Sequence, residues 1–194
     1  MDNNLLENRL ISILHDVTDW LKFAEAKNLL VITFNSAWLA FYIKKIFDID
    51  TTNKTLYILL GSICIIALIT SFISFIPKMF KPKFIDSFIE RNVGEITCED
   101  NLLFYKDISK YSVEEYFNAV NRDFFDGKLD NKELNYKYEK TIIKQIIAIS
   151  KIAYEKYYIF NISIVLSIIP NLILLVLFIY NMVAPITINL PKLF

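Results

Sequence analysis

The stretch from Asp130 to Ala184 constrains the fold of this chain most, because its character changes once along its length. Its first part, DNKELNYKYEKTIIKQIIAISKIAYEK, is amphipathic, and from Tyr157 onward there is no charged residue before Lys192. The stretch contains no glycine, and its first proline is Pro170. At about 1.5 Å per residue, a helix of the uncharged part is longer than the roughly 30 Å hydrocarbon core of a bilayer. The sequence therefore predicts a long helix that leaves a water-soluble region and continues into a membrane span over residues 157–184.

Two further uncharged segments precede this one. Residues 28–43, NLLVITFNSAWLAFYI, are followed by two lysines, and residues 56–77 carry no charge. Lysines that flank the first segment can extend to the membrane surface, and Trp38 lies toward one interface, as is typical of spans. The sequence predicts a transmembrane hairpin over residues 28–77, with spans of about 28–46 and 56–77. With 55% hydrophobic residues and only three glycines, the composition favours long helices and an all-α membrane protein.

Residues 1–27 form a predicted amphipathic helix outside the membrane. Apolar residues recur every three or four positions, as on one face of a helix. They are Leu6, Leu10, Ile13, Val17, Trp20 and Ala24. This apolar stripe can pack on the chain's own soluble region, or it can form a short coiled coil with a partner.

Residues 78–156 form the predicted soluble domain, which is small and helical. The region holds fourteen Lys and Arg residues against fourteen Asp and Glu residues, a balance that is typical of a solvated fold. Ser112 and Glu115 have the spacing of a capping box, in which each side chain bonds the other residue's backbone N–H. This pair predicts the start of a helix, and Asp126 with Gly127 predicts its end.

Three further predictions complete the coarse organisation of the chain. A second capping box, Asp130 with Glu133, marks the start of the long helix. A short helix is predicted over residues 84–92. The last ten residues, 185–194, form a short interfacial tail.

The positive charges predict how the chain crosses the membrane. The 78–156 region has fourteen Lys and Arg residues, compared with three in residues 1–27 and three in residues 44–55. Segments rich in Lys and Arg stay on the cytoplasmic side. We therefore expect the N-terminus and the soluble domain in the cytoplasm and the C-terminus outside, although Lys44 and Lys45 on the outer side count against this orientation.

The sequence contains no recognisable catalytic arrangement. There is no glycine-rich phosphate loop and no nucleophile elbow, and His15 is the only histidine that could serve as a base. A single histidine and two distant cysteines, Cys64 and Cys98, do not match a zinc site. The formal net charge is zero, so nucleic-acid binding is not expected. We therefore expect no enzyme activity, no metal and no cofactor.

Polar residues inside the predicted spans form a stripe. Ser163, Ser167 and Asn171 recur every four residues on one face of the third span, beside Pro170, where a kink is expected. Asn35 lies in the first span. The polar residues of the first span, Thr33, Asn35 and Ser36, favour hydrogen bonds and close packing between neighbouring helices, and the alternative is that they line a pore.

Several segments together resemble a known family. They are AEAKNLLVITFNSAWLA, NLLFYKDISKYSVEEYFNAVN and IIKQIIAISKIAYEKYYIFNISIVL, in this order and spacing. The matching positions are Glu25, Ala26, Lys27, Asn35, Asn101 to Phe104, Tyr116, Ser150, Ala153 and Lys156. This arrangement resembles the Pycsar effector transmembrane family. The chain departs from the family in having Glu25 where Asp is common, and Tyr105 with Lys106 where an aromatic residue and Gly are frequent.

The resemblance implies a function in bacterial antiphage defence. In that family a neighbouring pyrimidine nucleotide cyclase makes cyclic CMP or cyclic UMP on infection, and the effector then disrupts the inner membrane, which causes abortive infection. The implied partners are therefore one of these two nucleotides and the lipid bilayer. We also expect a homo-oligomer, because three thin spans cannot enclose a pore alone.

Basic and aromatic residues of the soluble domain are the candidates for nucleotide binding. Basic side chains could bind the cyclic phosphate, and a tyrosine ring could stack on the base. The candidates are Asn101, Tyr105, Lys106, Lys110, Tyr116 and Arg122. For each of them the alternative is a surface charge or a core aromatic residue.

Two other functions remain open at this point. The chain could be a membrane-anchored scaffold of a SLATT-type defence system that recruits a partner through residues 6–24. It could also be a small channel subunit, although the absence of charged residues from the spans counts against ion coupling.

Overall fold

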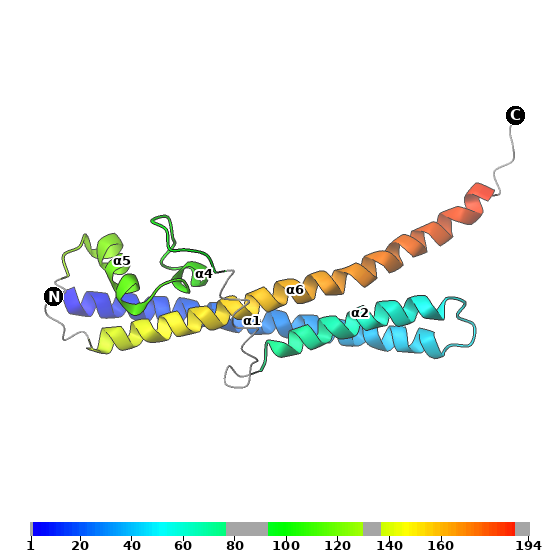
Figure 1. Cartoon of the computed structure of the whole chain (residues 1–194), viewed down its shortest axis with the longest axis horizontal. Helices are drawn as coiled ribbons and strands as arrows, with labels where there is room; N and C mark the ends of the chain where they lie inside the picture. The colour runs from blue at the N-terminus through cyan, green and yellow to red at the C-terminus, as the bar shows by residue number, and fades with distance from the viewer. Residues whose placement is uncertain (1, 77–92, 130–136, 189–194) are drawn as a thin grey trace, which may run out of the picture. The chain divides into compact units, whose positions relative to one another are not determined.

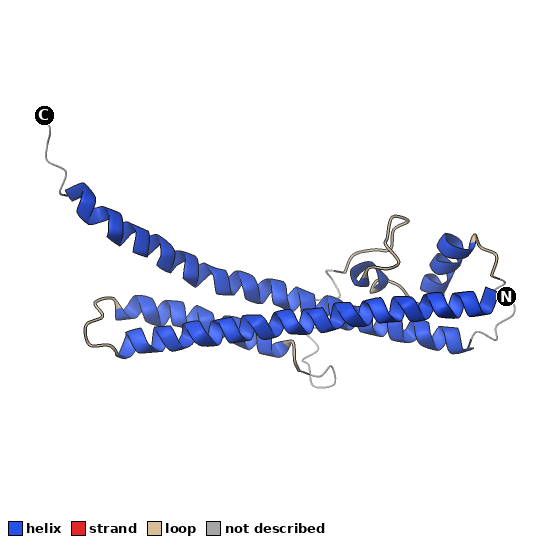
Figure 2. Ribbon diagram, turned by 180° about the vertical axis from the view of Figure 1, so that it is seen from behind, coloured by secondary structure: helices blue, strands red, loops and turns tan. Residues whose placement is uncertain are grey.

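The computed structural model describes residues 2–76, 93–129 and 137–188. These residues form helices and loops, with no strand among them, so the predicted all-α fold is confirmed (Figures 1 and 2). The described helices are α1 (Asp2–Phe47), α2 (Lys54–Ile73), α4 (Tyr105–Ile108), α5 (Val113–Phe125) and α6 (Lys137–Ile188). The predicted helix over 84–92, the predicted capping box at Asp130 and Glu133, and the end of the tail lie outside the described residues.

Three of the described helices, α1, α2 and α6, are long and apolar enough to cross a membrane. α1 continues without a break past residue 28, where the sequence changes from amphipathic to uncharged. α6 likewise continues past Lys156 and through Pro170. α2 ends at Ile73, before the span end predicted at residue 77. Ile76 precedes a proline, and the residue before a proline disfavours helical backbone angles, so an early end is physically reasonable.

The chain divides into two compact units. The first unit comprises Met1–Asn28 and Ser74–Phe160, and the second comprises Leu29–Ile73 and Asn161–Phe194. α1 and α6 therefore supply residues to both units. Residues 1–28 share a unit with the soluble region instead of forming a domain of their own.

An apolar core holds the first unit together. Leu6, Leu10, Ile13 and Val17 of α1 are at most 1% exposed and pack in one cluster with residues of α5 and α6. Their partners include Tyr116, Val120, Ile143 and Ile146. The apolar stripe of residues 1–27 thus packs on the chain's own soluble region, which was one of its two interpretations. Trp20 is the exception in the stripe, because 38% of its surface is exposed.

The ends of α5 confirm the predicted caps. Ser112 Oγ accepts a hydrogen bond from the Glu115 N–H, and the Glu115 carboxylate accepts one from the Ser112 N–H at 2.8 Å. At the other end Asp126 has φ 52°, in the left-handed region, and Gly127 has φ 71°. Asp and Gly tolerate these angles better than most residues, so the chain can turn away at this point.

The second unit contains the hairpin of α1 and α2 together with the last part of α6. Its buried core cluster consists of Tyr42, Leu60 and Cys64, with side chains of α6 packed against it. A Cβ atom added at Gly61 would lie 3.5 Å from Tyr42 Cβ, which shows that the two helices approach closely at this glycine. Small residues at helix contacts are typical of membrane proteins.

Candidate functional site

The first unit carries a surface groove beside Trp20. The groove has a volume of about 570 Å³, within the range of about 300–1,000 Å³ that small-molecule sites occupy. α1 forms one wall and the loop before α4 forms the other. The lining residues are Asp16, Asp19, Trp20, Phe23, Asn101, Leu103 and Phe104.

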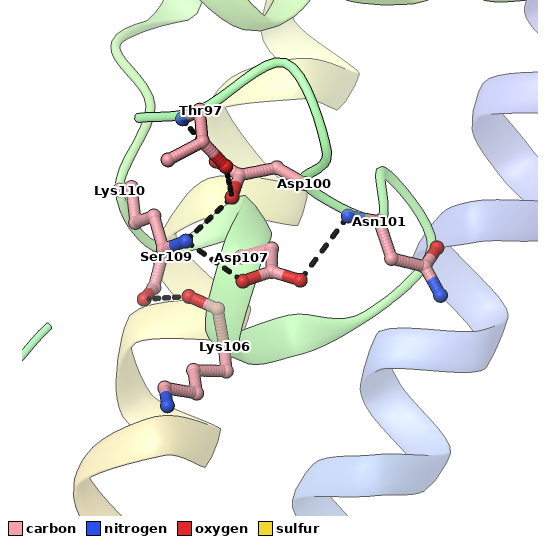
Figure 3. A network of polar contacts seen from close by, with 7 residues as sticks. All are labelled: Thr97, Asp100, Asn101, Lys106, Asp107, Ser109 and Lys110. Carbon is pink, nitrogen blue, oxygen red and sulfur yellow. Dashed lines mark hydrogen bonds and ion pairs between the residues drawn. The ribbon is translucent and has the colours of Figure 1, made fainter. Parts of the chain in front are cut away.

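Ionic contacts hold the loop wall of this groove in place (Figure 3). Lys110 Nζ lies 2.6 Å from Asp100 Oδ1 and 2.9 Å from Asp107 Oδ1, and the Lys110 and Asp100 side chains are only 10% and 4% exposed. Thr97 donates its N–H and its hydroxyl to the Asp100 carboxylate. Asp107 Oδ2 accepts the backbone N–H of Asn101 at 3.1 Å. The loop is therefore held by charged side chains that come before Asn101 in the sequence (Asp100) and after it (Asp107 and Lys110).

These contacts shift the pKa values of the Asp100 and Lys110 side chains. Burial raises the pKa of Asp100, but the hydrogen bonds from Lys110 and Thr97 and the charge of Lys110 outweigh it and lower this pKa to about 2. The hydrogen bond to Asp100 in turn raises the pKa of Lys110 above its ordinary value. Both groups stay charged near neutral pH, so the loop keeps its geometry over a wide pH range.

Aromatic rings lie next to the groove. The Trp20 ring centroid is 6.0 Å from that of Phe104 and 5.6 Å from that of Tyr105. Tyr105 stacks on Tyr157 at 4.8 Å with an interplanar angle of 15°. Burial, followed by the neighbouring tyrosines, raises the pKa of Tyr105 to about 12, so this phenol is neutral at physiological pH. The cluster holds Trp20 in position and leaves part of its surface exposed to the groove.

The structure brings two of the six nucleotide-binding candidates to this groove. Asn101 lines the groove and uses its Oδ1 to accept the Leu103 N–H at 2.9 Å. Tyr105 contacts Trp20 but does not itself line the groove.

The other four candidates have different surroundings. Lys110 is bound to Asp100 and Asp107, as described above. Tyr116 is fully buried and donates its hydroxyl to the Leu102 carbonyl at 2.7 Å. Arg122 pairs with its neighbour Asp123, and Lys106 is exposed. Nucleotide binding by any of the six remains a prediction.

Sequence reasoning did not identify the α1 side of the groove. Trp20 was assigned to the apolar stripe, and Asp16 and Asp19 were not among the candidate residues. The sequence did contain one indication of a binding surface here, because Trp20 lies on a water-soluble helix one residue after Asp19 and four residues after Asp16. The charged side chains that line the groove are both acidic, and Lys22 Nζ, a cation beside them, lies 3.0 Å from Asp19 Oδ1.

Lys156 connects three segments of the first unit. It is 8% exposed, its Nζ donates to the Ser74 carbonyl at 2.9 Å, and it lies 3.2 Å from Glu25 Oε1. Asn28 Nδ2 donates to the Lys156 carbonyl at 3.1 Å and to the Ala24 carbonyl at 3.0 Å. Glu25 and Lys156 come from two segments that carry the family resemblance, and these contacts join them.

The polar stripe of the second unit forms a hydrogen-bonded seam. Asn35 Nδ2 donates to Ser167 Oγ at 2.6 Å, and Ser167 Oγ donates to the Ser163 carbonyl. Cys64 Sγ donates to the Asn35 carbonyl at 3.2 Å, so all three long helices contribute. Asn35, Ser163 and Ser167 are at most 1% exposed. Asn171 bonds the Ser167 carbonyl. Among the four residues of the stripe, Asn35 and Ser167 bond each other between helices, whereas Asn171 bonds a carbonyl of its own helix. A pore-lining role of the stripe and the kink at Pro170 remain predictions.

The sequence comparison agrees with this arrangement. A family model described as the Pycsar effector protein domain matches residues 9–182, which cover both units. The chain belongs to the Pycsar effector family. The resemblance found in the sequence is thereby confirmed. No curated protein and no solved structure matches the chain.

Membership has three consequences for this Pycsar effector. It is a membrane protein of an antiviral defence family, as its three apolar helices and the family match together indicate. The family consists of non-enzymatic effectors. The family also connects the protein to a cyclic-nucleotide-linked system.

Proposed function

We propose that this Pycsar effector binds a cyclic pyrimidine nucleotide, cyclic CMP or cyclic UMP, and responds by disrupting the bacterial inner membrane. A pyrimidine nucleotide cyclase would supply the ligand during infection, and the effector would act as a homo-oligomer and cause abortive infection. The proposal includes the predicted orientation, with the first unit in the cytoplasm. The observation that carries it is the family match over residues 9–182.

The groove beside Trp20 supports nucleotide binding by the first unit. An exposed aromatic face can stack on a pyrimidine, an interaction worth about 1–3 kcal/mol per base. Asn101 and the carboxylates of Asp16 and Asp19 can accept hydrogen bonds from the base or from the ribose hydroxyl. Lys22 is 69% exposed at its side chain, so it can leave Asp19 and approach the phosphate.

The seam of the second unit supports a response in the membrane. Its hydrogen bonds hold α1, α2 and α6 together inside an otherwise apolar bundle. If a different arrangement of these helices exposed Asn35 and Ser167, the bundle would present polar groups to lipid or water. A nucleotide can favour that arrangement only if it binds it more tightly than the resting one.

Dye release from liposomes tests the proposal directly. Full-length protein in dye-loaded liposomes should release dye with cyclic CMP or cyclic UMP, and cyclic AMP serves as the purine control. No release with either pyrimidine nucleotide up to millimolar concentration would contradict the proposal.

A pair of variants tests the groove itself. Trp20→Ala should raise the half-effective nucleotide concentration at least about fivefold, because it removes the stacking surface. Phe124→Ala is the matched control, since this ring is similarly exposed, at 37% against 38%, and does not line the groove. A Trp20→Ala protein with unchanged half-effective concentration would exclude this groove as the nucleotide site.

A further inference from the structure

A second groove lies entirely within the second unit. It has a volume of about 1220 Å³ and is lined by the second half of α1, the loop between α1 and α2, the start of α2 and the last part of α6. This volume is above the range of about 300–1,000 Å³ that is usual for small-molecule sites. The groove can therefore accept a long ligand.

One part of the groove is apolar and rich in aromatic rings. Trp38 lies 6.2 Å from Phe34 and 5.5 Å from Phe41, measured between ring centroids. Leu175 and Phe178 of α6 also line the groove. Phe34, Phe41 and Phe178 are 45%, 37% and 62% exposed, so a large apolar surface is open to a ligand.

The other part of the groove is polar and charged. Lys45, Asp48, Asp50 and Thr51 line it near the loop between α1 and α2. Lys45 Nζ is 3.9 Å from Asp48 Oδ2, a long contact between side chains that are each 38% exposed. One lysine and two aspartates give this part a formal charge of −1, so it can hold one anionic group and has carboxylates left for a cation.

This division matches the chemistry of one lipid class. We infer that the groove binds a phospholipid with a primary ammonium head group, of the phosphatidylethanolamine type. The ammonium binds Asp48 and Asp50, the phosphate binds Lys45, and an acyl chain lies along the rings of Phe34 and Phe178. The inference concerns resting protein in the membrane and does not depend on nucleotide binding.

The charges of the polar part also disfavour two other possible occupants of the groove, an anionic phospholipid and a second copy of the chain. An anionic phospholipid such as phosphatidylglycerol offers Lys45 a phosphate but leaves both aspartates without a cation. A second copy that packs symmetrically on this groove brings Asp48 and Asp50 close to the same residues of its partner. Like charges at short distance repel.

Native mass spectrometry of the full-length protein with equimolar phosphatidylethanolamine and phosphatidylglycerol tests the inference. We expect the wild type to retain phosphatidylethanolamine at least about threefold more than phosphatidylglycerol. The double substitution Asp48→Asn and Asp50→Asn should weaken phosphatidylethanolamine binding about threefold to tenfold, as expected for partly exposed charge pairs. Asp126→Asn is the matched control, because Asp126 is an exposed carboxylate outside the groove whose positive φ also suits asparagine.

Three results would overturn the inference. The first is equal retention of the two lipids by the wild type. The second is an equal loss of phosphatidylethanolamine in the Asp126→Asn control. The third is a lipid-free dimer that Phe178→Ser dissociates, which would assign the groove to a second copy. Circular dichroism of each variant should show unchanged helicity, so that a change in binding is not a folding defect.

Discussion

The two units of this effector place apolar and polar side chains in opposite ways. The first unit buries Leu10, Ile143 and Ile146 completely. The second unit leaves large apolar side chains such as Leu175 and Val176 more than half exposed and buries Asn35 and Ser167. In water, burial of apolar surface drives packing. Between helices in lipid that driving force is absent, and hydrogen bonds and close contacts of small residues take its place.

α1 shows this difference within a single helix. Leu10 is 0% exposed in the first unit, whereas Leu30 is 69% exposed in the second, where Asn35 is 1% exposed. The backbone geometry is helical throughout. The reversal therefore reflects which surroundings each part of the helix has, and not a change in secondary structure.

The largest expected effect comes from a matched pair of leucine truncations. Leu10→Ala should lower the free energy of unfolding by about 2–5 kcal/mol, because it leaves a cavity in a buried core. Leu175→Ala should change it by less than about 0.5 kcal/mol, because that side chain packs against little of the protein. Chemical unfolding in detergent, followed by Trp20 fluorescence in a Trp38→Phe background for the first unit and by circular dichroism for the second, measures both. Equal losses would contradict the comparison of the two units.

The next largest expected effect is on the pH dependence of the stability of the first unit. The pKa of Asp100 is lowered from 3.8 to about 2, so its contribution to stability is present above about pH 4 and is lost as the pH falls toward 2. Asp100→Asn should remove this part of the pH dependence and cost about 1.5–3 kcal/mol at pH 7, the range for hydrogen bonds to charged groups.

Trp20 fluorescence during acid titration measures this pH dependence in the same Trp38→Phe background. Because other carboxylates titrate in the same range, the difference between wild type and variant is the relevant quantity. Asp126→Asn is the control, because it removes an exposed carboxylate outside the loop. An Asp100→Asn profile parallel to that of the wild type would show that the loop does not depend on this charge.

The smallest expected effect is in the seam of the second unit. Asn35→Leu removes the hydrogen bond to Ser167 Oγ, and Ser167→Ala removes the same bond from the other side. Hydrogen bonds between membrane helices contribute about 0.6 kcal/mol on average and up to about 1.7. A double-mutant cycle between these positions, measured by unfolding in mixed micelles, should give a coupling in this range.

Ser36→Ala is the control for the seam, because its hydroxyl bonds only the Ile32 carbonyl of its own helix and should contribute almost nothing between helices. A coupling near zero between Asn35 and Ser167 would mean that the seam sets the position of the helices without stabilising them.

Predictions that depended only on neighbouring residues in the chain were confirmed, whereas the surroundings of residues chosen by their type alone could not be predicted. The Ser112–Glu115 capping box involves neighbours in the chain, and the prediction was confirmed. Tyr116 and Lys110 were chosen as ligand candidates by residue type, but Tyr116 is fully buried and Lys110 is held by two carboxylates. The surroundings of Tyr116 and Lys110 are formed by other segments of the chain, so no local sequence pattern could predict them.

The sequence by itself determined the three apolar segments, the helical character of the long segments and the ends of α5, because these follow from helical periodicity, from local capping and from the length needed to cross a bilayer. Only the tertiary structure decided which side chains meet. It joined Glu25 with Lys156, brought Asn35 to Ser167, and formed the groove beside Trp20 from α1 and a loop some eighty residues later. Contacts between distant segments depend on how helices pack, and the spacing of residues along one helix carries no information about the neighbour that it will face.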